Sequence, residues 1–289
     1  MNSRLFLAAA FAVMASSCGG SSDTAAPLAT PSVSVNHTRV PLGSPIEVTY
    51  KFQVAPSARF DKDYRVLVHF LDADDELMWT DDHVPPQPTT AWKPGQTIEY
   101  TRTVFVPLYP YIGEAAIAIG LYAPGSGDRV PLAGDAIGQR AYRVARLRLQ
   151  PQTDNVFLAF LDGWHGPETA ADNQSVEWQW TRKEGVLRFR NPKRNAVFYL
   201  HYDGQPSMFD TPQTVTVSLG TEVIDTFQVS TPDEAIRKIA IKSAQFGPDD
   251  VVMVRIAVDR TFVPALVKPG SGDSRELGIR VFHAFVEPE

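Results

Sequence analysis

Tryptophans and a small charged group are the side chains with the clearest capacity for binding chemistry. Trp164, Trp178 and Trp180 fall in the second half of the chain. The charged residues that accompany them are Asp259, Asp273, Arg275 and Glu276. Aromatic rings can cover the apolar faces of a ligand while neighbouring polar groups hydrogen-bond to it, an arrangement suited to sugars. These residues are therefore the candidate ligand-binding set.

The same residues also have a purely structural explanation. Trp178 and Trp180 are two positions apart, so they share one face of a strand, while Glu177 and Gln179 occupy the other face. This alternation favours tryptophans that face a sandwich core, with the Asp–Arg–Glu group bracing a loop through ion pairs. A ligand site remains the alternative.

Motifs for nucleophilic catalysis are incomplete. Ser126 and Ser271 lie in identical PGSGD segments, but Pro124 and Pro269 stand where a nucleophile elbow requires glycine. Both segments have the composition of turns.

The acidic residues do not form a recognisable catalytic pair or metal-binding motif in the sequence. Two acidic pairs, Glu168 with Glu177 and Asp259 with Glu276, could act as a glycosidase pair only at a separation of about 5–9 Å, which a sequence cannot supply. An aspartate-rich segment, residues 72–82, precedes His83 but lacks the glycine and glutamate spacing of a calcium loop. We expect no catalytic residue, no metal and no cofactor.

The N-terminal segment predicts export. Residues 1–4 carry positive charge, residues 5–14 (LFLAAAFAVM) are apolar, and small residues precede Cys18. This order is typical of a secretory signal peptide, and the apolar run is shorter than the roughly 20 residues that span a bilayer. Residues 15–18 (ASSC) resemble the lipobox of bacterial lipoproteins, although Ala15 stands where leucine is commonest. The resemblance implies cleavage before Cys18 and acylation of its thiol, which would hold the protein at a membrane.

Two further features accompany this anchor. Gly19 follows Cys18 where an aspartate is associated with inner-membrane retention in enterobacterial lipoproteins, so the resemblance points to the outer membrane. Cys18 is also the only cysteine, so no intramolecular disulfide can form and the cores must be stable through packing alone.

Charge and composition exclude other classes of protein. The net charge of −6 argues against a nucleic-acid partner, which would require clustered Lys and Arg. The 23 prolines and 19 glycines, without a long helical stretch, favour short strands joined by turns. No later apolar run approaches the length of a transmembrane helix.

Alternating apolar and polar residues predict strands along most of the remaining chain. Residues 46–54, 97–106 and 251–258 are clear examples. We expect an all-β protein of two tandem antiparallel β-sandwich domains, the first immunoglobulin-like and the second jelly-roll-like. The expected divisions are a signal peptide at 1–17, a lipidated flexible tether at 18–30, a first sandwich at 31–149 and a second at 150–289.

Motifs in each domain carry a resemblance to known modules. In the first domain, residues 66–74, 90–95 and 120–124 resemble a β-sandwich module of bacterial envelope proteins, which implies a fold and no activity. The motifs of the second domain are residues 163–168, 178–180, 259–264 and 273–278. They resemble an accessory module of bacterial glycosyltransferase and polysaccharide-biosynthesis proteins, a resemblance that assigns no ligand and no catalytic residue.

These observations favour a non-enzymatic, lipid-anchored protein of the cell envelope that binds or scaffolds surface polysaccharide. Its expected partners are a membrane, reached through lipid on Cys18, and polysaccharide or an envelope protein. One alternative is a structural lipoprotein that docks an envelope assembly partner. A lesser alternative is a glycoside-active enzyme.

Overall fold

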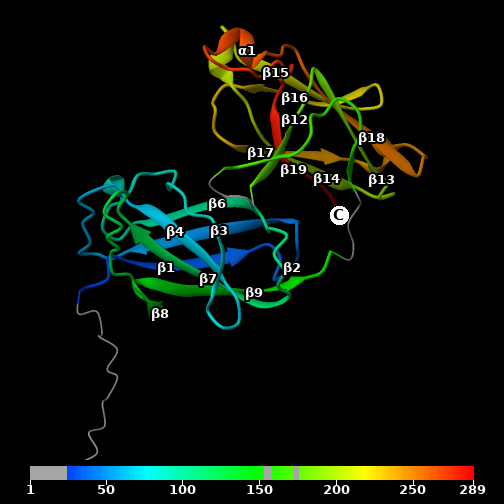
Figure 1. Cartoon of the computed structure of the whole chain (residues 1–289). Helices are drawn as coiled ribbons and strands as arrows, with labels where there is room; N and C mark the ends of the chain where they lie inside the picture. The colour runs from blue at the N-terminus through cyan, green and yellow to red at the C-terminus, as the bar shows by residue number, and fades with distance from the viewer. Residues whose placement is uncertain (1–24, 153–157, 172–175) are drawn as a thin grey trace, which may run out of the picture.

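The computed structural model describes residues 25–152, 158–171 and 176–289. The predicted signal peptide, Cys18 and the first part of the predicted tether lie outside these residues. The described chain consists mainly of β-strands in two bodies (Figure 1). The expectation of an all-β protein with two tandem sandwiches is confirmed.

The first sandwich contains two sheets. Sheet I has the order β1-β3-β6, and sheet II has the order β2-β9-β7-β4-β5, with β8 added beside β9. The strands are β1 (Ala29–Val35), β2 (Arg39–Pro41), β3 (Pro45–Val54), β4 (Arg65–Leu71), β5 (Leu77–Thr80), β6 (Thr97–Phe105), β7 (Gly113–Tyr122), β8 (Asp135–Gly138) and β9 (Ala141–Gln150). Their pairings are antiparallel except that β2 runs parallel to β9. Because β1 begins at Ala29, the last two residues assigned to the tether belong to a strand.

The core of the first sandwich lies between its two sheets. On β3 the side chains of Val48, Tyr50 and Phe52 are fully buried, and on β7 those of Ile117 and Ile119 are fully buried. The intervening residues of β3 are exposed or half-buried, so this strand alternates with the period of two that its sequence shows. Burying such apolar faces supplies the main driving force for folding.

The second sandwich has the same two-layer plan. Sheet III has the order β10-β13-β18-β15-β16, and sheet IV has the order β11-β12-β19-β14-β17. The strands are β10 (Ala159–Phe160), β11 (Glu168–Thr169), β12 (Glu177–Trp180), β13 (Glu184–Arg190), β14 (Ala196–Asp203), β15 (Gln213–Leu219), β16 (Glu222–Val229), β17 (Ala235–Ile241), β18 (Val251–Val258) and β19 (Arg280–Pro288). Residues such as Leu187, Phe198, Val217 and Ile256 fill the space between these sheets.

Among the residues that the structure describes, helical structure is confined to single turns. These are η1 (Thr89–Ala91), η2 (Pro206–Met208), η3 (Ser243–Phe246) and α1 (Pro264–Val267). Within the described residues, no helix has the length and apolar character that crossing a bilayer requires.

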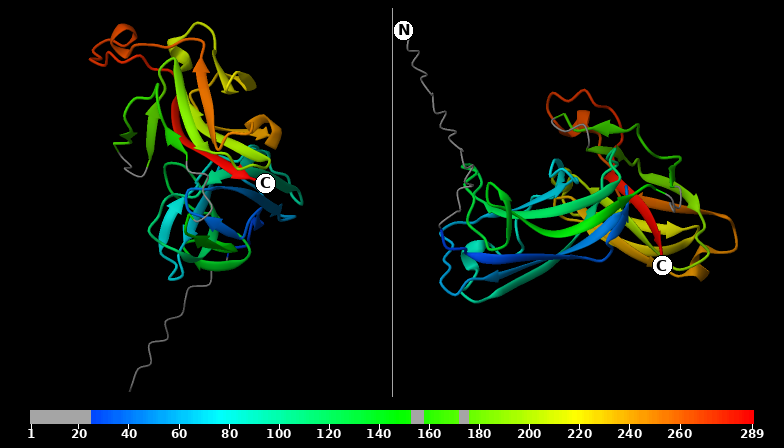
Figure 2. Two further views of the ribbon diagram at one scale, coloured as in Figure 1. Left: turned by 90° about the vertical axis from the view of Figure 1, so that its right-hand side faces the viewer. Right: turned by 90° about the horizontal axis from the view of Figure 1, so that it is seen from below.

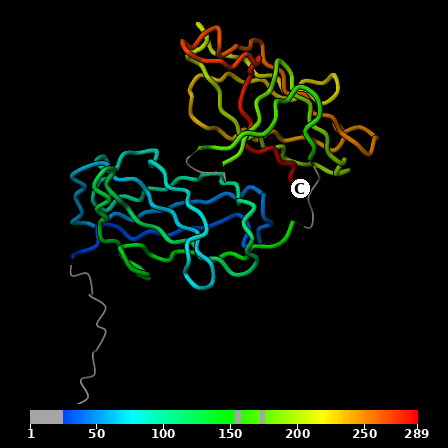
Figure 3. Tube along the Cα trace, viewed as in Figure 1, coloured from blue at the N-terminus to red at the C-terminus, as the bar shows by residue number. Residues whose placement is uncertain are grey.

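The two sandwiches meet through sheet IV. Figure 3 shows the two halves of the chain as separate bodies, and Figure 2 shows them from two further sides. Phe105, at the end of β6, stacks on His283 of β19, and Lys238 of β17 pairs with Glu47 of β3. Sheet IV therefore has its inner face in the second core and its outer face toward the first sandwich.

Candidate functional site

A row of aromatic rings crosses the outer face of sheet IV. The rings of Trp178 and Phe282 have centroids 6.1 Å apart, and those of Phe282 and His201 are 4.9 Å apart. His201 is paired with His283 across β14 and β19, with centroids 5.4 Å apart and the ring planes only 4° from parallel. Phe105 of the first sandwich stacks on His283 at 4.7 Å. We call these five rings the aromatic row.

Strand register explains why Trp178 faces outward. Gln179 pairs with Val281 and Trp180 pairs with Arg280, and directly opposed residues project from the same face of a sheet. Val281 belongs to the core between sheets III and IV. Trp178 and Trp180 therefore project from the outer face of sheet IV, away from the core between sheets III and IV. The alternation of the sequence had favoured tryptophans that face this core.

The two tryptophans of β12 nevertheless differ in burial. Trp180 is 8% exposed and packs with Phe262 and Leu277 in a small separate cluster. Trp178 is half-buried, at the edge of that cluster. Trp164 does not belong to the aromatic row. Its ring packs edge-on against Phe160, with the ring centroids 4.7 Å apart, and its indole N–H donates to the Val186 carbonyl. Trp164 is half-buried as well, so what distinguishes Trp178 among the candidate tryptophans is its place in the aromatic row.

Charged groups bound the Trp178 end of the row. Glu168 pairs with Trp178 across β11 and β12, and its carboxylate accepts a hydrogen bond from Arg275 at 2.6 Å. Arg275 also donates to both oxygens of Asp273, at 3.0 and 2.8 Å. The Arg275 guanidinium lowers the pKa of Asp273 to about 2. The predicted association of Asp273 with Arg275 thus exists and orients Glu168 beside Trp178.

A second ion pair lies under the row. The Arg280 guanidinium carbon is 4.9 Å from the ring centre of Trp178 and 5.3 Å from that of Phe282, within the range of cation–π attraction. Arg280 donates hydrogen bonds to both carboxylate oxygens of Asp203, a residue only 1% exposed. Burial raises the pKa of Asp203, and the bonds from Arg280 oppose that rise.

Two histidines stand next to Phe105 in the row, and Glu234 lies beside one of them. Nδ1 of His201 lies 3.1 Å from Nδ1 of His283, and Nε2 of His201 lies 3.0 Å from a carboxylate oxygen of Glu234. Burial and then the neighbouring His201 lower the pKa of His283 to about 4. The bond from His201 lowers the pKa of Glu234.

The remaining candidate residues brace loops. Asp259 accepts a hydrogen bond from the Thr214 backbone N–H at 2.8 Å and pairs with its neighbour Arg260. Glu276 accepts a 2.6 Å hydrogen bond from the Thr261 hydroxyl. Neither carboxylate makes a contact with a member of the aromatic row in the part of the chain that the structure describes.

The first sandwich contains its own polar cluster. Asp81 accepts hydrogen bonds from the buried Tyr50 hydroxyl at 3.0 Å and from Arg102 at 3.0 and 3.2 Å. The ring of His83 bridges the Asp81 carbonyl and the Tyr100 hydroxyl, at 2.7 and 2.8 Å. Burial raises the pKa of Tyr50 and Tyr100 and lowers that of His83. The cluster ties the segment after β5 to sheet I and is best explained as a structural clasp.

Sequence reasoning missed most of the aromatic row. Arg280 and Phe282 lie on β19, and their spacing of two places them on one face. The pairing of His201 with His283 depends on the register between β14 and β19, and the stacking of Phe105 on His283 depends on the contact between the two sandwiches. Neither can be predicted from the spacing of residues in the sequence. No triad of His, Cys, Asp or Glu suited to holding a metal ion occurs among residues 25–152, 158–171 and 176–289.

Comparison with known proteins gives distant matches only. No protein-family model and no curated protein matches the chain. A family GH115 4-O-methyl-alpha-glucuronidase with specificity for decorated arabinogalactans is 12% identical, with a TM-score of 0.33 over 53% of this chain and 20% of that one. The CBM22-1–CBM22-2 tandem of a Paenibacillus barcinonensis protein is 10% identical, with a TM-score of 0.27 over 86% of this chain and 80% of that one.

A third match joins a catalytic domain to the CBM51-1 and CBM51-2 domains of Clostridium perfringens ZmpB. It is 9% identical, with a TM-score of 0.28 over 93% of this chain and 32% of that one. This chain thus spans about a fifth of the length of the glucuronidase and about a third of the length of the ZmpB structure. The similarity to bacterial carbohydrate-binding tandems is distant, and the interpretation of the site depends on the geometry alone.

Proposed function

We propose that this protein is a lipid-anchored, non-enzymatic component of a bacterial cell envelope whose second sandwich binds polysaccharide. The observation that carries the proposal is the half-buried ring of Trp178 beside Phe282, on a sheet face flanked by Glu168, Arg280 and Glu234. Aromatic rings provide apolar contact to sugar faces, and the flanking side chains supply hydrogen bonds to sugar hydroxyl groups.

A binding role is favoured over a catalytic one because the nearby carboxylates already have partners. Glu168 bonds Arg275, Asp203 bonds Arg280, and Glu234 bonds His201. A general acid for glycoside cleavage needs a raised pKa and a free approach to the glycosidic oxygen. The pKa of Glu234 is lowered, and Asp203, whose pKa is raised, is 1% exposed and bonded to Arg280, so it has no free approach to a glycosidic oxygen.

Binding to polysaccharide is tested by titration of the chain from Gly19, which retains every described strand, with envelope polysaccharide fractions followed by tryptophan fluorescence. We expect a saturable change, and Trp178→Ala and Phe282→Ala should each weaken binding about tenfold, near 1.4 kcal/mol. Trp79→Phe, in the first sandwich, is the matched control. Unchanged affinity in both folded row variants would overturn the proposal.

The anchor has a separate test. Residues 1–18 support acylation of Cys18, and Gly19 supports placement in the outer membrane. The full chain should partition with outer-membrane fractions and incorporate labelled palmitate, and Cys18→Ser should abolish both. Recovery of the unsubstituted chain as an unmodified protein in the aqueous fraction would refute lipid anchoring without affecting the polysaccharide site.

A second candidate function is docking of an envelope protein. It is favoured by three exposed apolar side chains on the outer face of sheet III, namely Val223, Val251 and Met253, at 58%, 50% and 43% exposure. Exposed apolar side chains that share one sheet face can contribute to an interaction surface. Replacing Val251 and Met253 with serine should reduce crosslinking to envelope proteins in cells and leave polysaccharide binding unchanged. If crosslinking is unaffected, sheet III is not a docking face.

A further inference from the structure

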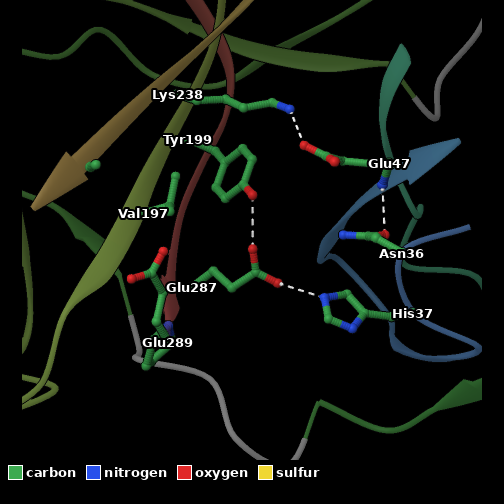
Figure 4. Close-up of a pocket in the computed structure, with 10 residues that line it drawn as sticks. Asn36, His37, Glu47, Val197, Tyr199, Lys238, Glu287 and Glu289 are labelled. Carbon is green, nitrogen blue, oxygen red and sulfur yellow. Dashed lines mark hydrogen bonds and ion pairs between the residues drawn. The ribbon is translucent and has the colours of Figure 1, made fainter. Parts of the chain in front are cut away.

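A polar groove adjoins the aromatic row at the junction of the two sandwiches. Its volume is about 440 Å³, within the usual range for a small-molecule site. Its walls come from the β1–β3 end of the first sandwich and from β14, β17 and β19 of sheet IV (Figure 4). The polar side chains that line it include Asn36, His37, Glu47, Tyr199, Lys238 and Glu287.

The groove and the aromatic row share one sheet face. Tyr199 and His201 are two positions apart on β14 and therefore project from the same side. The ring of Phe105 lies edge-on to Tyr199 at 6.4 Å and parallel to His201 at 5.9 Å. Phe105 and Tyr199 are buried, at 9% and 5% exposure, so they lie between the row and the groove. A ligand chain that occupies both would have to pass over the outside of this contact.

Contacts within the groove hold its walls together and leave acceptors available. Lys238 pairs with Glu47 across the two sandwiches, and the Tyr199 hydroxyl donates to Glu287 at 2.8 Å. His37 Nε2 lies 3.7 Å from the other oxygen of Glu287 (Figure 4). A carboxylate has about four lone-pair positions, so these contacts leave capacity to accept hydrogen bonds from a ligand.

The charge of the groove selects among sugars. Three carboxylates, those of Glu47, Glu287 and Glu289, line it together with a single lysine, Lys238. Like charges at short range disfavour a bound carboxylate or sulfate, whereas hydroxyl and ammonium donors complement the available oxygens. The lining therefore suits a neutral or amine-bearing sugar and opposes an acidic one.

We infer that the groove is a second subsite for the same polysaccharide chain and that it accepts a neutral or amine-bearing sugar unit. The inference rests on the proposed function of the aromatic row and adds a subsite with a charge preference. Both sandwiches contribute residues to this subsite.

The test uses envelope polysaccharide hydrolysed to oligosaccharides, graded by length and separated by anion exchange into neutral or basic and acidic pools. Calorimetry would measure affinity for the chain from Gly19 and for three variants. Ala240→Phe places a ring in the groove from an exposed position of β17. Thr226→Phe, exposed on β16 of the opposite sheet, is its matched control, and Trp178→Ala removes one ring of the aromatic row.

We expect long neutral or basic oligosaccharides to bind about tenfold more tightly than short ones. Ala240→Phe should abolish this gain with length and leave short oligosaccharides unaffected, whereas Thr226→Phe should change neither. Replacing Glu289 with lysine should improve binding of the acidic pool. These results together would establish the subsite.

Other outcomes distinguish the proposed binding role of the aromatic row from the proposed subsite in the groove. Weaker binding in Trp178→Ala together with full length dependence in Ala240→Phe would overturn the groove and retain the row. Tighter binding of acidic than of neutral oligosaccharides would also overturn the charge preference. An affinity that is unchanged in Trp178→Ala, or no binding of any pool, would overturn the proposed function and the subsite with it.

Discussion

The Nδ1 atoms of His201 and His283 lie 3.1 Å apart across β14 and β19. A hydrogen bond at this distance requires one nitrogen to carry a proton and the other to offer a lone pair, so the contact is lost if both rings are fully protonated. Phe105 stacks on His283, which places this proton-dependent pair at the junction of the sandwiches. Glu234 faces His201 from the segment before β17, and it is the acidic partner of the pair.

The histidine pair predicts a loss of stability in acid. The pKa of His283 is about 4 in the folded protein, below its ordinary value of 6.5, because burial and His201 oppose its protonation. The unfolded chain therefore binds more protons than the folded chain between these values. The free energy of unfolding should be fully retained above pH 6.5 and should fall as the pH decreases toward 4.

Urea unfolding of the second sandwich, followed by tryptophan fluorescence at several pH values, measures this dependence. His283→Phe keeps the stacked ring and removes the titration, so its stability should vary less with pH between about 4 and 6.5. A variant with the same pH dependence as the original chain would show that other groups are responsible.

Removal of the Asp81 carboxylate should destabilise the first sandwich. Asp81→Ala leaves the Tyr50 hydroxyl, a group in a fully buried residue, and Arg102 without their acceptor. Breaking a buried ion pair costs about 3–5 kcal/mol, and partial exposure of Arg102 places the expected loss near the lower end. Asp74→Ala, in the exposed β4–β5 turn, should change stability by less than about 0.5 kcal/mol. Equal decreases in the free energy of unfolding for the two variants would show that the Asp81 cluster does not stabilise the first sandwich.

The periodicity of the sequence was sufficient to predict the strands and the all-β fold class. The alternation in residues 46–54 predicted a strand, and β3 spans Pro45–Val54 with its apolar side chains buried. The segment at residues 251–258 coincides with β18. Such strands could be predicted because one buried face imposes a period of two along the chain. Register could not be predicted, because it depends on partners distant in sequence.

The candidate site was harder to predict for a physical reason. Trp178 and Trp180 were correctly placed on one face, but sheet IV has apolar layers on both of its faces, the main core and the small cluster around Phe262. Alternation alone cannot distinguish two such layers. Asp273 and Arg275 are near in sequence, so their pairing could be anticipated, whereas Glu168 joins them from more than 100 residues away.

A glycine substitution should test the packing that supports Trp164. Gly163 has a φ of +82°, and a Cβ atom there would lie 1.8 Å from the Glu184 carbonyl oxygen, so Gly163→Ala must displace backbone. We expect a loss of more than about 2 kcal/mol in the second sandwich, since strain and a clash act together. Gly166→Ala, whose Cβ would meet nothing within 4 Å, is the control and should be nearly neutral. Similar thermal midpoints for the two variants would disprove the predicted clash.

Arg280 should matter for both stability and binding. In Arg280→Gln the carboxylate of Asp203, 1% exposed, loses its cation, and an unpaired buried charge costs about 3–5 kcal/mol. The pKa of Asp203 is already raised by burial and should rise further in the variant. Because a raised folded pKa favours the fold below the unfolded value of 3.8 and disfavours it as the pH rises, the variant should be least impaired in acid.

The matched control for this variant is Arg255→Gln. Arg255 bonds Glu184 on the surface, where both side chains are 46% exposed, so its loss should cost less than about 1 kcal/mol at any pH. Urea unfolding of both variants at pH 4 and pH 7 separates the two cases. Arg280→Gln should also weaken polysaccharide binding, because Arg280 lies against the rings of Trp178 and Phe282 and fixes their positions. If the two arginine variants proved equally stable at pH 7, Asp203 would have to be stabilised by groups other than Arg280.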